Sequence, residues 1–303
     1  MHVEEPAGNW GGPWTEEKLD AFQKYVRAYL TIMRKRKNFK TLYFDGFAGS
    51  GARSDEADER PAPFPLFEDL SISLEEQHLY RGAAERVLAL GGEGLLFDYY
   101  YFIDADRQAL KQLEQRLEER FPSLKPRMIF RASDCNEQLK NLGSALKRDR
   151  QLAALVFLDP FGMQISWEAI ESLKNTRSDV WILIPTGLAI NRLLDRKGEL
   201  RHLPGLERFF GMNEEQIRNR FYRKRQELSL FGETATAWQK VGGAIEIIAN
   251  TYIEQMKTIW KHVIPKPLVL RNSRGTPIFH FVFASNNPTA LKIAKDIVGK
   301  KNQ

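Results

Sequence analysis

The segment Leu152–Leu158 (LAALVFL) constrains the fold most, because every residue in it is apolar. An unbroken apolar run of this length is typical of a central parallel strand that is covered on both faces of its sheet. The run ends in Asp159–Gly162 (DPFG), and the residues Trp167–Leu173 are expected to form a helix. A buried strand that leads into a helix predicts an α/β fold built from parallel strands and crossover helices.

The same alternation of strand and helix continues on both sides of this segment. Further strands are predicted at Thr41–Asp45, Tyr99–Ile103, Arg127–Arg131 and Val180–Ile184. Helices are predicted at Trp14–Met33, Arg81–Leu90, Arg107–Phe121 and Gly243–Trp260. Near the C-terminus, Leu268–Arg271 and Ile278–Ala284 should pair as antiparallel strands before a last helix that starts at Pro288. The sequence thus predicts a doubly wound, Rossmann-like α/β fold with a mostly parallel sheet and an antiparallel C-terminal strand.

We expect residues 1–303 to form a single domain that carries two insertions. Residues 52–80 have the composition of a loop insertion, acidic at first and then rich in proline. Residues 190–240 are predicted to be a basic helical insertion with interleaved aromatic residues. Its basic side chains include Arg192, Arg196, Lys197, Arg201, Arg218, Arg220, Arg223, Lys224 and Arg225. Such a segment is either a helical subdomain with a solvated basic face or a surface that binds nucleic acid.

The composition is that of a globular protein, with 43% hydrophobic and 28% charged residues. The formal net charge of +6 makes nucleic acid, either DNA or RNA, a reasonable partner. The single cysteine, Cys135, excludes an internal disulfide, and the five histidines form no metal-ligand pattern. The N-terminal residues do not resemble a signal peptide, and the longest apolar run, Val180–Leu194, is too short to cross a bilayer. We therefore expect a cytoplasmic protein without a membrane partner.

A glycine-rich turn follows the first predicted strand, in the segment Thr41–Gly51 (TLYFDGFAGSG). The strand ends in Asp45, and three glycines come after it, at Gly46, Gly49 and Gly51. Glycines at this spacing let the backbone adopt positive φ and approach a ligand without an intervening Cβ. The turn indicates a ligand crossing of a doubly wound sheet, although tight loops without a ligand use the same residues.

Four predicted strand ends carry an aspartate, at Asp45, Asp104, Asp134 and Asp159. In an open α/β sheet, ligands bind outside the carboxyl ends of the strands. The four carboxylates are therefore predicted to converge on one crevice. Aspartate is also common after strands because it caps helices and turns, and that explanation stays open for each residue.

The turn resembles that of S-adenosylmethionine-dependent amino-methyltransferases, in which phenylalanine precedes spaced glycines. The resemblance implies a cofactor site that includes Asp45, Gly46 and Phe47, with Gly49 and Gly51 beneath the methionine part of the cofactor. It also implies that Asp104 accepts both ribose hydroxyls, that Asp134 accepts the adenine amino group, and that the backbone at Cys135 pairs with a ring nitrogen. The distance from Gly51 to Asp104 greatly exceeds the ~20 residues of a dinucleotide fingerprint, which counts against NAD.

The motif Asp159-Pro160-Phe161-Gly162 is similar to the Asp-Pro-Phe-Gly motif of tRNA guanine N2-dimethyltransferases. The resemblance implies that the Asp159 carboxylate and the Pro160 carbonyl accept the two N–H bonds of an exocyclic amine. Phe161 would stack on the base, and Gly162 would leave room for it. The aromatic residue stands third in this motif, whereas the related Asp-Pro-Pro-Tyr motif has it fourth.

The whole chain resembles the three-Cys-motif partner (TcmP) family, which is named for a neighbouring protein with a three-cysteine motif. The resemblance is carried by Trp14 with Lys18, YFDGFAGSG, Arg81-Gly82, FIDAD, FLDPFG and the closing FHFVFASNN. It implies a class I methyltransferase-like fold whose reaction is not established. It also implies a possible partner protein that bears the three-cysteine motif.

Three functions follow from these patterns. The first is an S-adenosylmethionine-binding, methyltransferase-like protein that acts on an exocyclic amine of a nucleic-acid base. The second is a non-catalytic or partner-dependent binding subunit that keeps the cofactor fold, so whether the chain is an enzyme stays open. The third is a metal-dependent nuclease that uses Asp45, Asp104, Asp106 and Asp159. It is the weakest, because hard cations favour clustered carboxylates without a glycine cradle.

Overall fold

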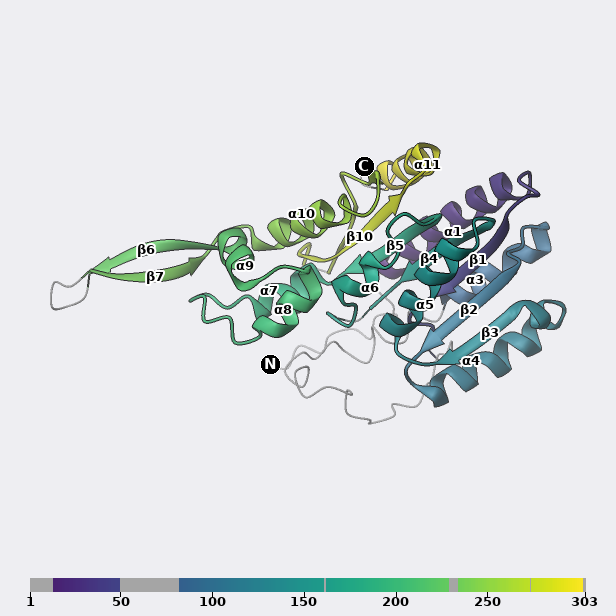
Figure 1. Ribbon diagram of the computed structural model, residues 1–303, viewed down its shortest axis with the longest axis horizontal. Helices are drawn as coiled ribbons and strands as arrows, with labels where there is room; N and C mark the ends of the chain where they lie inside the picture. Colours follow the sequence, from purple (N-terminus) through teal and green to yellow (C-terminus); the bar gives the residue numbers. More distant parts are fainter. Residues whose placement is uncertain (1–12, 50–81, 161, 229–233, 273, 302–303) are drawn as a thin grey trace, which may run out of the picture.

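The computed structural model describes residues 13–49, 82–160, 162–228, 234–272 and 274–301. Its centre is an eight-stranded sheet with the order β3-β2-β1-β4-β5-β10-β8, in which β9 pairs with β10 (Figure 1). The strands are β1 (Lys40–Asp45), β2 (Tyr99–Asp104), β3 (Met128–Ala132), β4 (Leu152–Leu158), β5 (Ser178–Ile184), β8 (His262–Val263), β9 (Leu268–Arg271) and β10 (Pro277–Ser285).

The first five strands are parallel, and β10 runs antiparallel to β5. The strand order reverses between the neighbouring strands β1 and β4. From β1 the sheet continues through β2 to β3, and from β4 it continues the opposite way through β5 to β10. Such a switch point opens a crevice at the carboxyl ends of the two strands. The predicted fold class, a Rossmann-like and mostly parallel sheet with an antiparallel C-terminal strand, is confirmed.

Helices cover both faces of the sheet (Figure 1). They are α1 (Pro13–Met33), α3 (Ala83–Ala89), α4 (Arg107–Arg120), α5 (Cys135–Arg148), α6 (Trp167–Glu171), α10 (Ala244–Met256) and α11 (Pro288–Gly299). Helix α1 contacts α3 and α11, whereas α5 contacts α6. Within the described ranges, the structure contains no helix long and apolar enough to span a membrane.

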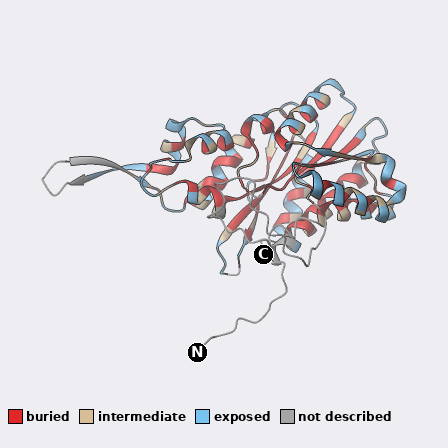
Figure 2. Cartoon of the chain, turned by 90° about the horizontal axis from the view of Figure 1, so that it is seen from below, coloured by how far each residue is buried: buried red, intermediate tan, exposed pale blue. Residues whose placement is uncertain are grey.

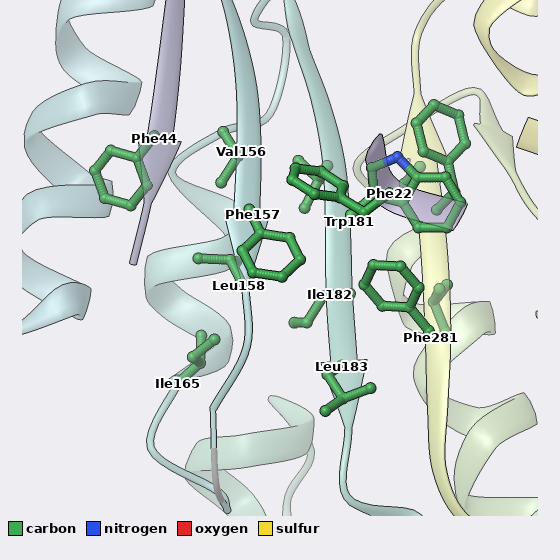
Figure 3. Close-up of a cluster of buried hydrophobic side chains, with 14 of the residues drawn as sticks. Phe22, Phe44, Val156, Phe157, Leu158, Ile165, Trp181, Ile182, Leu183 and Phe281 are labelled. Carbon is green, nitrogen blue, oxygen red and sulfur yellow. The ribbon is translucent and has the colours of Figure 1, made fainter. Parts of the chain in front are cut away.

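The core lies where α1 packs on the central strands. Phe22 of α1 contacts Phe157 of β4 with ring centroids 4.3 Å apart, and Trp181 of β5 stacks on Phe281 of β10 at 4.6 Å (Figure 3). Buried residues follow the strands, and exposed residues follow the outer sides of the helices (Figure 2). Because burying each large apolar side chain is worth about 1.5–3 kcal/mol, this layer holds α1 firmly on the sheet.

The segment 190–240 is only partly helical, so the prediction of a helical insertion is wrong for its second half. Its first half forms η5 (Thr186–Ile190), α7 (Asn191–Leu193), α8 (Leu203–Phe210) and α9 (Glu214–Phe221). The rest is an antiparallel hairpin of β6 (Tyr222–Leu228) and β7 (Thr234–Lys240). Tyr222 of β6 lies opposite Lys240 and Trp238 of β7 lies opposite Lys224, so the two aromatic residues share one face of the hairpin. The predicted loop insertion at 52–80 lies outside the described residues.

Candidate functional site

The carboxyl ends of β1, β2 and β4 bring three aspartates to one edge of the sheet. Asp45 is the last residue of β1, Asp104 is the last residue of β2, and Asp159 follows β4 directly. In the parallel register, Asp45 lies opposite Phe102 on one side and Phe157 on the other. The charges of Asp159 and Asp104 both act on the pKa of Asp45, so the three carboxylates face the same region.

The glycine turn after β1 is attached to both neighbouring strands. The Gly46 amide donates to the Phe157 carbonyl at 3.0 Å, and the Ala48 amide donates to the Ile103 carbonyl at 2.9 Å. Gly49 has a φ of +61°, and a Cβ placed on it would meet no atom within 4 Å among the described residues. This left-handed conformation favours glycine and leaves its backbone open on one side. Gly51 lies outside the described residues.

Gly46 is required by close approach. A Cβ at this position would lie 2.6 Å from the Cys135 sulfur and 2.8 Å from a Leu158 methyl carbon. Both contacts are far inside van der Waals distance, so a side chain here would force α5 and β4 apart. The turn therefore stays close to the sheet edge only with glycine at position 46.

Replacing Gly46 with alanine is expected to lower the free energy of unfolding by about 1–3 kcal/mol, the usual cost of an overpacked core. Urea denaturation measures this change. Gly92→Ala is the matched control, because a Cβ at Gly92 meets nothing within 4 Å in the described part of the chain. Equal stability of the two variants would show that the turn adapts without strain.

Asp104 holds the backbone of Gly49 in place. Its Oδ2 accepts from the Gly49 amide at 2.7 Å, and its Oδ1 accepts from the Asp106 amide at 2.8 Å. Burial raises the pKa of Asp104 above its ordinary value, while the two amide donors lower it. Asp106 itself caps α4 by accepting from the Gln108 and Ala109 amides. Asp104 is thus a half-buried carboxylate held against the glycine turn.

Asp45 is buried beneath the turn, with 2% of its surface exposed. It accepts from the Tyr43 hydroxyl at 3.0 Å and from the Phe47 amide at 3.3 Å. Burial raises the pKa of Asp45 to about 7, the two hydrogen bonds oppose this, and Asp159 and Asp104 add to it. Asp45 therefore organises the turn from below through these two hydrogen bonds.

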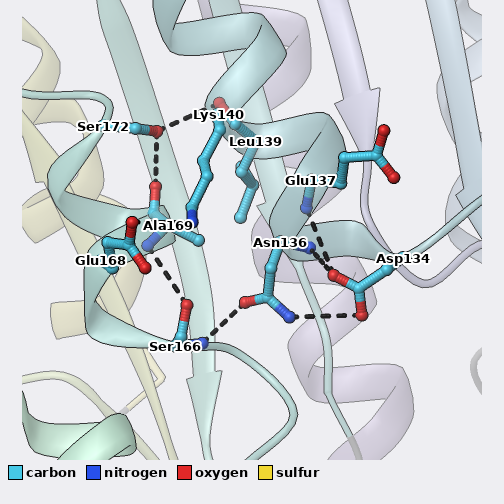
Figure 4. A network of polar contacts seen from close by, with 9 residues as sticks. All are labelled: Asp134, Asn136, Glu137, Leu139, Lys140, Ser166, Glu168, Ala169 and Ser172. Atoms are coloured by element: carbon cyan, nitrogen blue, oxygen red, sulfur yellow. Dashed lines mark hydrogen bonds and ion pairs between the residues drawn. The ribbon is translucent and has the colours of Figure 1, made fainter.

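Asp134 begins α5 and caps it. Its Oδ1 accepts from the Asn136 amide at 2.8 Å and from the Glu137 amide at 3.2 Å (Figure 4). Asp134 therefore caps a helix, which is the explanation that we left open for each strand-end aspartate. Cys135 is buried beside it, and burial raises the pKa of its thiol well above the ordinary value.

Asn136 is a site residue that sequence reasoning missed. Its side chain accepts from the Ser166 amide at 2.7 Å (Figure 4). It also donates to the Gln164 carbonyl at 2.9 Å. These two bonds join the start of α5 to the segment that follows Asp159–Gly162. Its position two residues after the strand-end aspartate Asp134 was the only available signal.

Asp159 forms a buried ion pair with Lys18 of α1. The Lys18 Nζ lies 2.5 Å from the Asp159 Oδ2, and neither side chain is exposed to solvent. We assigned Lys18 no role from sequence, although it shares the buried face of α1 with Phe22 and Tyr25. Pro160 and Gly162 are buried as well, and the Gly162 amide donates to the Gln164 Oε1 at 3.2 Å. Phe161 lies outside the described residues.

The ion pair between Lys18 and Asp159 fits poorly with the hypothesis of a metal-dependent nuclease. A lysine ammonium already neutralises the Asp159 carboxylate, at a place that a divalent cation would need. In the described ranges, no group of three or more His, Cys, Asp or Glu side chains is arranged to hold a metal ion. The geometry at Asp159 therefore supports the nuclease hypothesis least.

A further polar pair lies beyond β5. The His280 Nδ1 is 2.8 Å from the Thr186 hydroxyl, and both side chains are buried. Burial lowers the pKa of His280 to about 4, so the ring is neutral near pH 7. His280 lies opposite Ile184, the last residue of β5, and thus at the same edge of the sheet as Asp159.

Comparison with known proteins does not assign the chain to a family. No family model matches the chain, and no curated protein matches it. A Legionella pneumophila protein of the DUF519 family is 14% identical with a TM-score of 0.38, and the match covers 84% of this chain and 93% of that one. A conserved hypothetical protein from Streptococcus pyogenes is 13% identical with a TM-score of 0.28, over 70% of this chain and 94% of that one.

An uncharacterized protein of the COG1565 superfamily from Burkholderia thailandensis is 10% identical, with a TM-score of 0.30. The match covers 97% of this chain and 66% of that one. At these scores the likenesses say nothing about function. The sheet topology and the geometry of the strand ends carry the functional argument instead.

Proposed function

We propose that the chain binds S-adenosylmethionine at the carboxyl edge of β1 and β2 and methylates an exocyclic amine of a nucleic-acid base. The observation that carries the proposal is the open, left-handed Gly49 whose amide is held by Asp104. The proposal includes kinship with the three-Cys-motif partner family, on the motifs that the sequence shares with it.

The residues present fit this cofactor. Asp104 uses one lone pair on each oxygen for a backbone amide, which leaves further lone pairs for a ribose hydroxyl pair. The Asp134 Oδ2 has only a long contact of 3.4 Å to the Asn136 side chain, so it can also accept from an adenine amino group. When bound, S-adenosylmethionine supplies an electrophilic methyl group on a positively charged sulfur.

We assign the acceptors for the substrate amine to the Asp159 carboxylate and the Pro160 carbonyl. Lys18 fixes the orientation of the carboxylate through the 2.5 Å contact. An exocyclic amine is a poor nucleophile because its lone pair is delocalised into the ring. Two fixed acceptors would orient it, and orientation is a large part of what such a site contributes. Phe161 and Gly162 complete the assignment as the residues beside the base.

The burial of Asp159 favours a second candidate function, a non-catalytic binding subunit. A fully buried pair between α1 and β4 can serve the fold alone, without contacting a substrate. In that case the chain would bind the cofactor and act with a partner, such as a protein with the three-cysteine motif.

Methyl transfer distinguishes the two candidates. The full chain is incubated with S-adenosylmethionine labelled in its methyl group and with DNA or RNA of mixed sequence, each in single-stranded and in duplex form. We expect label in the nucleic acid and none in a thymine or uracil homopolymer, because these bases lack an exocyclic amine. Cofactor binding without any transfer would support the binding subunit, and equal labelling of the homopolymer would contradict the amine as acceptor.

A further inference from the structure

The hairpin of β6 and β7 projects from the body of the protein (Figure 1). Its root is well anchored, because Tyr222 is buried and the Lys240 ammonium donates to the carbonyls of Asn191 and Leu194. A Cβ on Gly198 would lie 2.7 Å from Trp238, so the loop before α8 fits closely against the hairpin. The hairpin is therefore a fixed projection and not a loosely attached loop.

Both faces of the hairpin near its root are basic. Arg223, Lys224, Arg225 and Gln226 are all exposed. Successive residues of a strand point to opposite faces, so Arg223 and Arg225 share one face and Lys224 lies on the other. The register places Arg223 opposite Gln239, which adds a polar neighbour to the arginine face.

Arg223 and Arg225 differ from the nearby Arg218 and Arg220 in their ion pairing. Arg218 pairs with Glu214 at 2.7 Å, and Arg220 pairs with Glu254 of α10. Within the described part of the chain, no ion pair engages Arg223 or Arg225. Two exposed arginines that pair with no carboxylate among the described residues are available to an external anion.

We propose that the hairpin binds double-stranded DNA, with β6 along the major groove and Arg223 and Arg225 on phosphates. The major groove of B-form DNA is wide enough to admit a two-stranded ribbon. Residues two apart on a strand are separated by about 6.8 Å, which matches two steps of the 3.4 Å charge spacing along one DNA strand. The inference rests on the proposed function, and it assigns the nucleic-acid substrate to a duplex.

Trp238 favours a duplex over a single strand. Single-strand binders offer exposed aromatic rings on which unstacked bases stack. The Trp238 ring is half-buried, with the Arg218 guanidinium 5.5 Å and the Lys224 ammonium 5.3 Å from its centroid. Its ring is thus already engaged by two cations, and it contributes rigidity to the hairpin. Duplex RNA is disfavoured because its major groove is deep and narrow.

The position of the hairpin suits the proposed reaction. The segment that carries it, from η5 to α10, leaves the sheet directly after Ile184, the last residue of β5. The carboxyl end of β5 lies next to that of β4, where Asp159 is found. DNA held by the hairpin would therefore approach the same edge of the sheet as the cofactor site.

Fluorescence anisotropy of the full chain with short labelled nucleic acids tests the inference. We expect duplex DNA to bind more tightly than single-stranded DNA or duplex RNA. Its log affinity should fall linearly with log salt, and Arg223→Ala with Arg225→Ala should reduce that slope by ~1.8, or ~0.9 for each lost phosphate contact. Arg148→Ala with Arg150→Ala removes equal charge from exposed sites at the C-terminal end of α5 and should leave the slope unchanged.

Equal affinity for single strands or for duplex RNA would overturn the inference, and so would an unchanged slope in the Arg223 and Arg225 variant. Calorimetry of the same variant with S-adenosylmethionine separates this failure from that of the proposed function. The hairpin inference predicts unchanged cofactor binding in this variant. Wild-type protein that binds S-adenosylmethionine but no DNA would overturn the hairpin inference and leave the proposed cofactor site standing.

Discussion

Replacing Asp159 with asparagine is expected to lower the free energy of unfolding by about 3–5 kcal/mol. The change removes the carboxylate from a fully buried ion pair, and breaking such a pair by removing one partner is strongly destabilising. Urea denaturation at neutral pH measures the loss. Asp20→Asn is the matched control on the same helix, because the Asp20 side chain is solvent-exposed and its pairs with Lys24 at 2.9 Å and Lys301 at 2.7 Å should each be worth at most about 1 kcal/mol.

Removing both charges should recover most of that stability. A buried ion pair that is replaced by neutral groups of similar volume is often close to neutral in stability. We therefore expect Lys18→Met with Asp159→Asn to be more stable than Asp159→Asn alone, with a coupling free energy of roughly 0.5–3 kcal/mol. Additive losses in the double variant would contradict the buried pair.

The double variant also separates a role of Asp159 in methyl transfer from a role in the fold alone. If Asp159 accepts the substrate amine, the double variant folds but transfers methyl groups at least about 100-fold more slowly, which corresponds to roughly 2.7 kcal/mol of barrier. If the pair only stabilises the fold, transfer returns together with stability. Single-turnover rates at saturating cofactor give this comparison without interference from binding.

Most of the sheet follows from local sequence. The boundaries of β4 are those of its apolar run, and the antiparallel pair of β9 and β10 lies where alternating apolar residues and a short connection indicated it. Helix α11 starts at Pro288 with Asn287 as its cap. These elements bury a regular apolar pattern, and such a pattern is visible in sequence.

The hairpin could not be predicted in the same way. Its described β6 residues beyond Tyr222 are exposed, so no alternation of buried and exposed residues marks them as a strand. Helix α5 was missed for another reason. Asp134 and Glu137 have the spacing of a helix start, but we left capping as an open explanation for Asp134 and predicted no helix after it.

The Lys18–Asp159 pair depends on tertiary structure. The two residues are 141 positions apart, and only the seating of α1 on β4 brings them together. A lysine at one position of an apolar helix face is the single local sign of such a pair. The candidate site was thus predictable in its strand-end carboxylates and not in the partners that hold them.

Asp104→Ala is expected to weaken S-adenosylmethionine binding by roughly 5- to 150-fold, or about 1–3 kcal/mol. The substitution removes the acceptor assigned to the ribose hydroxyls, and it releases the Gly49 amide at the same time. Asp106→Ala is the matched control, because Asp106 is an exposed cap of α4 two residues away. It should cost about 1 kcal/mol of stability and leave cofactor affinity unchanged.

Calorimetric titration of the full chain with S-adenosylmethionine tests the central claim most directly. The account predicts saturable binding by the wild type and by Asp106→Ala, with the weaker affinity confined to Asp104→Ala. Wild-type protein that binds no cofactor up to millimolar concentration, or an Asp104→Ala variant that binds as tightly as the wild type, would contradict it.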